Sequence, residues 1–147
     1  MTLDNLLGRM LETIESDSLT IQRLLEAAAR NIKDAKLEAL SNENRFDAAY
    51  KAIMQLANAA LQANGFRTLT SRPGHHQTMI QSLPKIIGLD NEVMIVLDAL
   101  RKQRNVADYS GDLVSEKVVK ECIYRAEQLQ GLVQEWLQRH RPEFLKR

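Results

Sequence analysis

The sequence predicts an all-α protein, an antiparallel up-and-down bundle of four to five helices. Only 5% of the 147 residues are aromatic, and Ala, Leu, Glu, Gln, Lys and Arg dominate, which is typical of packed helices. Apolar residues recur at three- and four-residue intervals along most of the chain. No repeat, low-complexity tract or linker divides it. We therefore expect a single helical domain over residues 1–147, with its core at about 18–139 and short connections.

The first 40 residues predict two helices. A short amphipathic helix from Leu3 to Ile14 is expected to stop near Ser16, because its apolar residues follow helical spacing: Leu3, Leu6, Leu7, Met10, Leu11 and Ile14. Asp17 or Ser18 can cap the next helix. That helix is expected from Leu19 to Leu40, since its apolar stripe continues without Gly or Pro.

The third predicted helix follows a break at residues 41–44 and begins around Glu43. Asn64 and Gly65 are expected to end it, because glycine accepts the left-handed conformation found at many helix ends. We expect residues 66–74 to form a loop. One broad face of this helix carries apolar side chains: Phe46, Ala49, Tyr50, Ile53, Met54, Ala57, Ala60 and Leu61.

Two further helices are predicted between residues 75 and 110. The first runs from His75 to Leu83 and is expected to end before Pro84, since the residue ahead of a proline disfavours helical geometry. Asp90 or Asn91 caps the second, which includes residues 101–109. The triplet Met94-Ile95-Val96 also suits a strand, but the length and flanks of the segment favour a helix.

The last predicted helix is the longest. Gly111 interrupts the chain before it, Ser115 opens it as an N-cap, and Pro142 closes it. Cys122 lies on its inward face and is expected to be a small buried hydrophobic residue. The residues expected to point inward are Val118, Val119, Cys122, Ile123, Ala126, Leu129, Leu132, Val133, Trp136 and Leu137.

Charge and cysteine content exclude several classes of protein. The formal charge of +1 is unlike that of a non-specific nucleic-acid coater, although local basic patches remain compatible with it. A single cysteine allows no intramolecular disulfide, which is typical of a cytosolic protein. The chain shows neither a signal-peptide pattern nor an apolar run of about 20 residues, so we expect a cytoplasmic protein without a membrane partner.

The first candidate site is a polar cluster at residues 101–109. On a helix, Arg101, Arg104 and Asp108 share one face, and Asn105 and Tyr109 form the neighbouring pair. Arginine suits phosphate, asparagine can bond a base, and tyrosine offers a stacking surface, so this cluster suits RNA or a nucleotide. The alternative is an ordinary surface ion pair between Arg104 and Asp108, with Tyr109 half buried.

The second candidate site is a histidine pair. His75 and His76 follow Gly74 at a predicted helix start, where anions are favoured, and Arg67 and Arg72 lie just ahead. This arrangement predicts a phosphate-binding corner. The alternatives are a solvent-exposed pair, or one histidine that caps the helix while the other packs. We expect no metal and no cofactor, because no cysteine spacing or HExxH motif accompanies the pair.

Other residues give no catalytic signal. Phe46 and Tyr50 are interpreted as core aromatics because they share a face with Ile53 and Met54. No GxSxG, P-loop, GxGxxG or paired-carboxylate pattern occurs.

The order of these motifs resembles that of the HEPN superfamily, the higher eukaryote and prokaryote nucleotide-binding domains. The resemblance covers about residues 40–137. It implies a helical bundle, often dimeric, from bacterial toxin-antitoxin, defence or phage-related systems. The matching elements are RF-x2-AY (Arg45, Phe46, Ala49, Tyr50), ALQANGFR (Ala60 to Arg67), GHH (Gly74 to His76) and RN-x2-DY (Arg104, Asn105, Asp108, Tyr109).

Many HEPN proteins are metal-independent ribonucleases with an arginine, usually a polar residue, and then a histidine a few positions later. Two protomers bring both copies into one cleft. Arg104 and Asn105 match the start of that motif, but Asp108 and Tyr109 stand where the histidine is expected. Histidine has the pKa that suits proton transfer near neutral pH, whereas ordinary Asp and Tyr do not. The resemblance therefore favours a non-catalytic member.

Three functions follow as expectations. The first is a homodimeric module that binds RNA or a nucleotide. The second is an endoribonuclease toxin in which His75 or His76 supplies the missing proton transfer. The third is a partner of a small nucleotidyltransferase or of an antitoxin, with Tyr109 as a target for nucleotide attachment. The candidate catalytic residues are Arg104, Asp108 and Tyr109, and the candidate binding residues are Arg67, Arg72, His75, His76, Arg101, Arg104 and Asn105.

Overall fold

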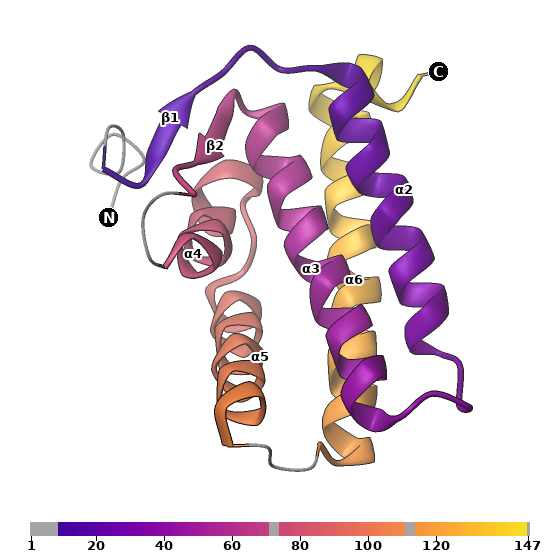
Figure 1. Cartoon of the computed structure of the whole chain (residues 1–147). Coiled ribbons are helices and arrows are strands. Elements are labelled where there is room, and N and C mark those ends of the chain that lie inside the picture. Colours follow the sequence, from indigo (N-terminus) through magenta and orange to yellow (C-terminus); the bar gives the residue numbers. More distant parts are fainter. Residues whose placement is uncertain (1–8, 71–73, 111–113, 147) are drawn as a thin grey trace.

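The described residues form five α-helices and one short pair of strands (Figure 1). The computed structural model describes residues 9–70, 74–110 and 114–146, and the side chains of residues 108–110 also lie outside this description. The elements are β1 (Leu11–Thr13), α2 (Ser18–Ala35), α3 (Asn42–Ala63), β2 (Phe66–Thr68), α4 (His75–Ile87), α5 (Asn91–Ser110), α6 (Glu116–His140) and the 3₁₀ helix η1 (Pro142–Leu145). The prediction of a helical bundle is confirmed.

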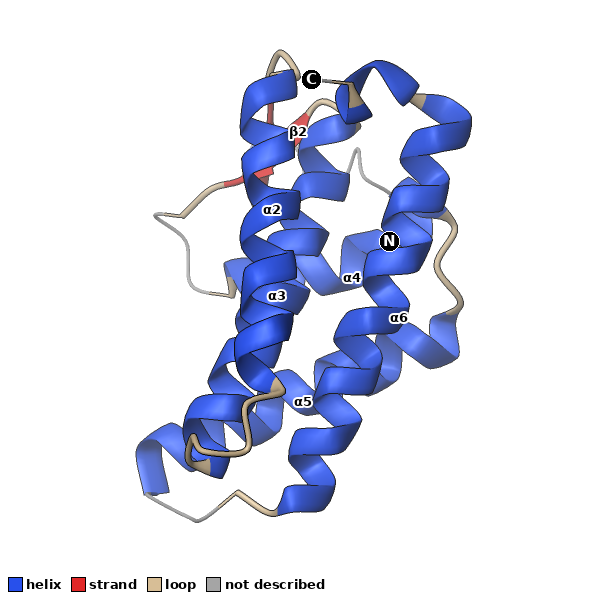
Figure 2. Cartoon of the chain, turned by 90° about the vertical axis from the view of Figure 1, so that its right-hand side faces the viewer, coloured by secondary structure: helices blue, strands red, loops and turns tan. Residues whose placement is uncertain are grey.

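Helix α3 is the centre of the bundle. It packs against α2, α4, α5 and α6, and it lies between α2 and the α4 and α5 pair, with α6 behind it in Figure 1. The view turned by 90° shows α2, α3 and α6 running beside one another (Figure 2). Thirteen of the 22 residues of α3 are buried, six of them alanines. These small side chains allow the neighbouring helices to approach closely.

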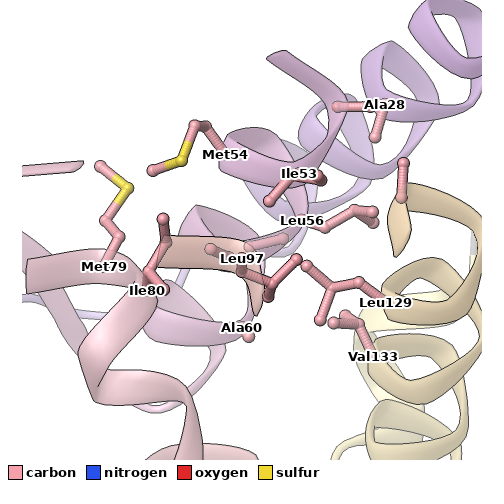
Figure 3. Close-up of a cluster of buried hydrophobic side chains, with 14 of the residues drawn as sticks. Ala28, Ile53, Met54, Leu56, Ala60, Met79, Ile80, Leu97, Leu129 and Val133 are labelled. Atoms are coloured by element: carbon pink, nitrogen blue, oxygen red, sulfur yellow. The ribbon is translucent and has the colours of Figure 1, made fainter. Parts of the chain in front are cut away.

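The core joins apolar side chains from all five helices. Ile53, Leu56 and Ala60 of α3 lie at its centre in Figure 3. Around them the same figure shows residues of the other helices: Ala28 of α2, Met79 and Ile80 of α4, Leu97 of α5, and Leu129 and Val133 of α6. Cys122 is also buried in the core, as expected.

Several predicted helix ends are confirmed by hydrogen bonds. Asp17 caps α2, where its carboxylate accepts from two backbone N–H groups of the first turn. Ser115 caps α6 through its hydroxyl oxygen, as predicted. Ser41, which was expected in the break before the third helix, caps α3 in the same way. Gly65 follows the end of α3 with a φ of 87°, a left-handed conformation that glycine adopts without steric cost. The local sequence therefore set these helix ends.

The predicted helix over residues 3–14 is wrong at the described residues 9–14, and the predicted loop over residues 66–74 is wrong at residues 66–68, which form strand β2. Strand β1 pairs with β2 in antiparallel register, with Leu11 opposite Thr68. The Ile14 N–H donates to the Gly65 carbonyl at 2.8 Å and extends the pairing. A short apolar pattern does not separate strand from helix. Residues 11–13 form a strand because pairing with β2 provides hydrogen-bond partners for their backbone N–H and C=O groups while the Leu11 side chain is buried in the core.

Two helix ends also differ from the prediction. Helix α4 continues through Pro84 to Ile87, because Pro84 removes one hydrogen bond while Leu83 and Ile86 extend the buried face. Helix α2 stops at Ala35 instead of Leu40. The reason is tertiary, since the buried Arg45 of α3 donates from Nε to the Ala35 carbonyl at 2.8 Å.

The inward face of α6 is confirmed with one exception. Leu132 was expected in the core, but 37% of it is exposed. It lines a surface cavity with Trp136. Gly111, the predicted break before α6, lies outside the described residues.

Candidate functional site

Three helices bring polar side chains together around one surface cavity of about 360 Å³. Helix α3 supplies Asp47 and Tyr50, α4 supplies His76, and α5 supplies Arg104. We call this space the Arg104 cavity. Its remaining lining is contributed by α3 and α4: Lys51, Met54, Gln55, Asn58 and Met79.

Tyr50 forms the inner wall of the cavity. Only 3% of the residue is exposed, yet its hydroxyl lies 3.2 Å from Nδ1 of His76. Burial raises the pKa of Tyr50 to about 12, although the positive charges of Arg104 and Arg101 act in the opposite direction. The phenol is therefore uncharged at neutral pH. It links α3 to α4 by a hydrogen bond between two neutral groups.

Arg104 lies across the face of Tyr50. Its guanidinium carbon is 5.1 Å from the centre of the tyrosine ring, within the range of a cation–π interaction. Its Nε lies 3.5 Å from Oδ1 of Asp47, and both side chains of this ion pair are partly exposed. Solvent screens such a pair, so its contribution to stability is small. The two contacts set the direction of the guanidinium at the cavity.

His76 is the histidine that lines the Arg104 cavity. Burial lowers the pKa of His76, and the neighbouring positive charge of Arg104 and Arg101 and the proximity of His75 lower it further. The rings of His75 and His76 meet edge to face with their centres 4.6 Å apart. His76 is therefore neutral at pH 7 and able to accept a proton.

The chemistry of the cavity suits an anion. Arg104 and Lys51 supply positive charge, and the amides of Gln55 and Asn58 add hydrogen-bonding groups. Asp47 offsets part of that charge. Within the described parts of the chain, no three His, Cys, Asp or Glu side chains gather in a way that would hold a metal ion.

A comparison with family models identifies the chain. The model described as HEPN domain matches residues 21–136, which is most of the sequence. The chain belongs to the HEPN family. It is therefore a nucleotide- or RNA-related module, as the resemblance of its motifs implied. No curated protein and no solved structure matches the chain. Across the residues that the structure describes, no helix is both long and apolar enough to traverse a bilayer.

This HEPN domain brings some of the predicted site residues together. Arg104 and His76 line the same cavity, and His75 lies against His76. Arg101 does not line the cavity and pairs with Asp98 of its own helix at 2.8 Å. Its positive charge nevertheless acts to lower the pKa values of Tyr50 and His76.

The other predicted binding residues are dispersed. Arg67 lies on β2 and pairs with Glu12 of β1. Asn105 is exposed on α5 and does not line the cavity. Arg72 and the side chains of Asp108 and Tyr109 lie outside the described residues. Arg104 forms an ion pair with Asp47 of α3, a partner that its own helix did not suggest.

Every polar site residue on α3 was missed in the sequence: Asp47, Tyr50, Lys51, Gln55 and Asn58. Tyr50 was correctly interpreted as buried, but its hydroxyl reaches the cavity wall. Asp47 lies one turn before it and contacts Arg104. A signal was present, because Lys51, Gln55 and Asn58 recur at helical spacing along the same edge of an otherwise apolar helix.

A larger cavity of about 450 Å³ lies elsewhere in the HEPN domain, between α6 and the turn from α4 to α5. Trp136 and His140 stack there with ring centres 4.9 Å apart. None of the predicted site residues lines it. The convergence of Arg104, Tyr50 and His76 therefore identifies the smaller cavity as the candidate site.

Proposed function

We propose that this HEPN domain binds the phosphate groups of RNA or of a nucleotide in the Arg104 cavity, without cleaving them. The observation that carries the proposal is the convergence of Arg104, Tyr50 and His76 from three helices around one open cavity. A guanidinium has five N–H donors, so it can face Asp47 and still bond two phosphate oxygens. Lys51 adds a second cation, and Gln55 and Asn58 suit the ribose or base.

The surroundings of the protein are part of the same proposal. We assign it to the cytoplasm and to a bacterial toxin-antitoxin or defence system, as the family resemblance implies. A homodimer is supported by the outer face of α5. Ile95 and Val106 lie three turns apart on that face and are 62% and 56% exposed. Large apolar side chains aligned in this way are typical of protein interfaces.

The direct test is binding of a labelled single-stranded RNA of about 8 nucleotides, a length typical of single-strand sites. Arg104→Ala is expected to weaken binding about tenfold or more, because a hydrogen bond to a charged group contributes about 1.5 to 3 kcal/mol. Fluorescence anisotropy measures the affinity, and a thermal melt verifies folding.

The matched control is Arg125→Ala. Arg125 also lies over a tyrosine ring, that of Tyr124 at 5.2 Å, and pairs with Glu121, but it is on α6 and outside the cavity. Its removal should leave RNA affinity unchanged. Equal losses in the two variants would contradict the proposed site.

A second candidate is a metal-independent ribonuclease, because a neutral His76 shares the cavity with Arg104. In that reaction His76 accepts the 2′-OH proton, the 2′-oxygen attacks phosphorus, and the 5′-oxygen leaves after it is protonated. Arg104 stabilises the phosphate charge. The products are a 2′,3′-cyclic phosphate and a 5′-hydroxyl.

Incubation of RNA with the protein and a chelator distinguishes the two functions. Cleavage that is lost in His76→Ala would establish the ribonuclease. Intact RNA that nevertheless binds with Arg104-dependent affinity would establish the binding module. Nucleotide attachment at Tyr109 by a partner nucleotidyltransferase stays a prediction from the family resemblance.

A further inference from the structure

A second cavity adjoins the Arg104 cavity along the edge of α3. It measures about 560 Å³ and lies between α2 and α3. Lys51 and Gln55 line both cavities, so one wall is common to the two. We call this second space the α2–α3 cavity. The two cavities are therefore neighbours on the same edge of α3.

The packing of α2 against α3 builds this second space. Ala27 of α2 lines it with a single methyl group, which leaves room between the helices. The amide of Asn31 donates from Nδ2 to Oε1 of Gln55 at 2.8 Å and joins α2 to α3 at the shared wall. This bond fixes the position of Gln55 between the two cavities. The shared wall is thus part of the folded structure.

The α2–α3 cavity is basic. Arg30, Lys33 and Lys51 line it, opposed by the single carboxylate of Asp34. None of the three cations forms an ion pair with another residue that the structure describes. With Arg104 on α5, cations therefore line both cavities and the wall that they share, and they come from α5, α3 and α2.

We propose that the two cavities form one continuous site for a single-stranded polynucleotide, with successive phosphates at Arg104, at Lys51 and at the Arg30 and Lys33 pair. This inference rests on the proposed function and specifies its ligand. A mononucleotide fills the Arg104 cavity and leaves Arg30 and Lys33 without a partner. A polynucleotide carries one phosphate per nucleotide, so it reaches all of these cations at once.

A single strand fits this site better than a duplex does. Each of the two adjoining cavities can accept an unpaired base or sugar. In a duplex the bases are paired and stacked, so they cannot enter the cavities. The cations follow a line from helix to helix, as expected for a groove that tracks a flexible backbone. RNA and DNA share this phosphodiester chemistry. The experiment therefore includes both.

The test uses the full chain with labelled RNA and DNA strands of about 8 nucleotides, a length typical of single-strand sites, and with a dinucleotide. The variant is the double substitution Arg30→Ala and Lys33→Ala. Both residues are exposed on a helix, where alanine is the best helix former, so the fold is kept. Affinity is measured by anisotropy over a series of salt concentrations.

The wild-type chain is expected to bind the 8-nucleotide strand at least about tenfold more tightly than the dinucleotide. In the double variant, the slope of log affinity against log salt concentration should fall in magnitude by about 1.4 for the strand, because each of the two lost phosphate contacts contributes about 0.7 for single strands. Dinucleotide affinity should not change. The same double substitution at Lys117 and Lys120 of α6 removes equal charge at equal spacing and is the control, since neither residue lines either cavity.

Two results would overturn the inference. One is a strand that binds no more tightly than a dinucleotide does while both depend on Arg104, and this result would leave the proposed function intact. The other is an equal change of slope in the α2 and α6 variants. If neither ligand binds the wild-type chain, the proposed function fails and the continuous site fails with it. A preference for RNA over DNA, or the reverse, would identify the sugar that the strand carries and would support the site.

Discussion

Helices α3 and α5 both line the Arg104 cavity, yet they pack very differently against the rest of the bundle. Helix α3 is covered by four other helices and buries thirteen residues. Helix α5 packs mainly against α4 and α3, and among its residues 91–107 only Leu97 and Leu100 are buried. One side of the site therefore belongs to the core, and the other side lies on the periphery.

The two helices therefore contribute to the cavity in different ways, α3 with fixed side chains and α5 with an adjustable one. Tyr50 and Asp47 have positions fixed by the packing of α3, so they provide a reference surface. Arg104 is carried by a helix with few core contacts, so its position can adjust to a ligand at low cost in stability. Substitutions in α3 should mainly change folding, and those on α5 should mainly change binding.

The largest effect is expected from Leu56→Ala in α3. Leu56 is fully buried, and its truncation leaves a cavity, so the free energy of unfolding should fall by about 2 to 5 kcal/mol. Chemical denaturation measures this change. Gln103→Ala on α5 is the control, because Gln103 is exposed, and it should stay within about 0.5 kcal/mol of wild type. Similar losses in the two variants would mean that α5 is as much a part of the core as α3.

Hydrogen exchange sharpens the comparison at the level of the backbone. Amides in the middle of α3 should exchange only through global unfolding, because their side chains lie in the core. Amides near Arg104 in α5 should open locally and exchange about tenfold faster or more. Mass spectrometry of peptides from each helix measures the rates. Equal protection of the two helices would remove the proposed freedom of Arg104.

A smaller effect is expected from Tyr50→Phe. The ring stays under Arg104, but the hydrogen bond to His76 is lost, so unfolding should become easier by about 0.5 to 1.5 kcal/mol. Urea denaturation measures the difference. Tyr124→Phe is the matched control, since Tyr124 is an exposed tyrosine that also lies under an arginine. A loss of equal size at Tyr124 would show that the His76 contact contributes nothing.

The smallest effect concerns pH. The pKa of His76 is lowered by burial from 6.5, so below pH 6.5 the unfolded chain binds a proton that the folded chain binds only at lower pH. The contribution of His76 to stability is fully present above about pH 6.5, and it is lost as the pH falls from there through the lowered pKa of the folded state. Thermal melts at a series of pH values should show a shallower decline for His76→Gln than for wild type. Identical slopes would contradict the burial of His76.

Local patterns predicted most of the fold, and tertiary contacts account for the errors. The caps at Asp17, Ser41 and Ser115 depend on residues close in sequence, so they could be identified without a structure. Strand β1 could not, because it forms through pairing with β2, more than fifty residues away. The early end of α2 likewise depends on Arg45, a residue of the next helix.

The site was only partly predictable for the same reason. Arg104 and His76 were identified from residue type and the resemblance, but their shared cavity depends on how α4 and α5 pack against α3. Tyr50 lies in a strongly apolar helical pattern, which predicted a core residue and gave no sign that its hydroxyl contacts His76. The ion pair of Arg104 with Asp47 joins two helices, and helical spacing within α5 suggests only Asp108 as a partner.

The buried thiol on α6 has a practical consequence for spectroscopy. Cys122 is the only cysteine in the chain, it is fully buried, and burial raises its pKa to about 12. The thiolate is the nucleophile that attacks maleimide reagents, so the native protein should resist them. A cysteine introduced at an exposed position such as Gln103 would then be the one reactive thiol, and a spin label or dye could be attached to α5 without first removing the natural sulfur.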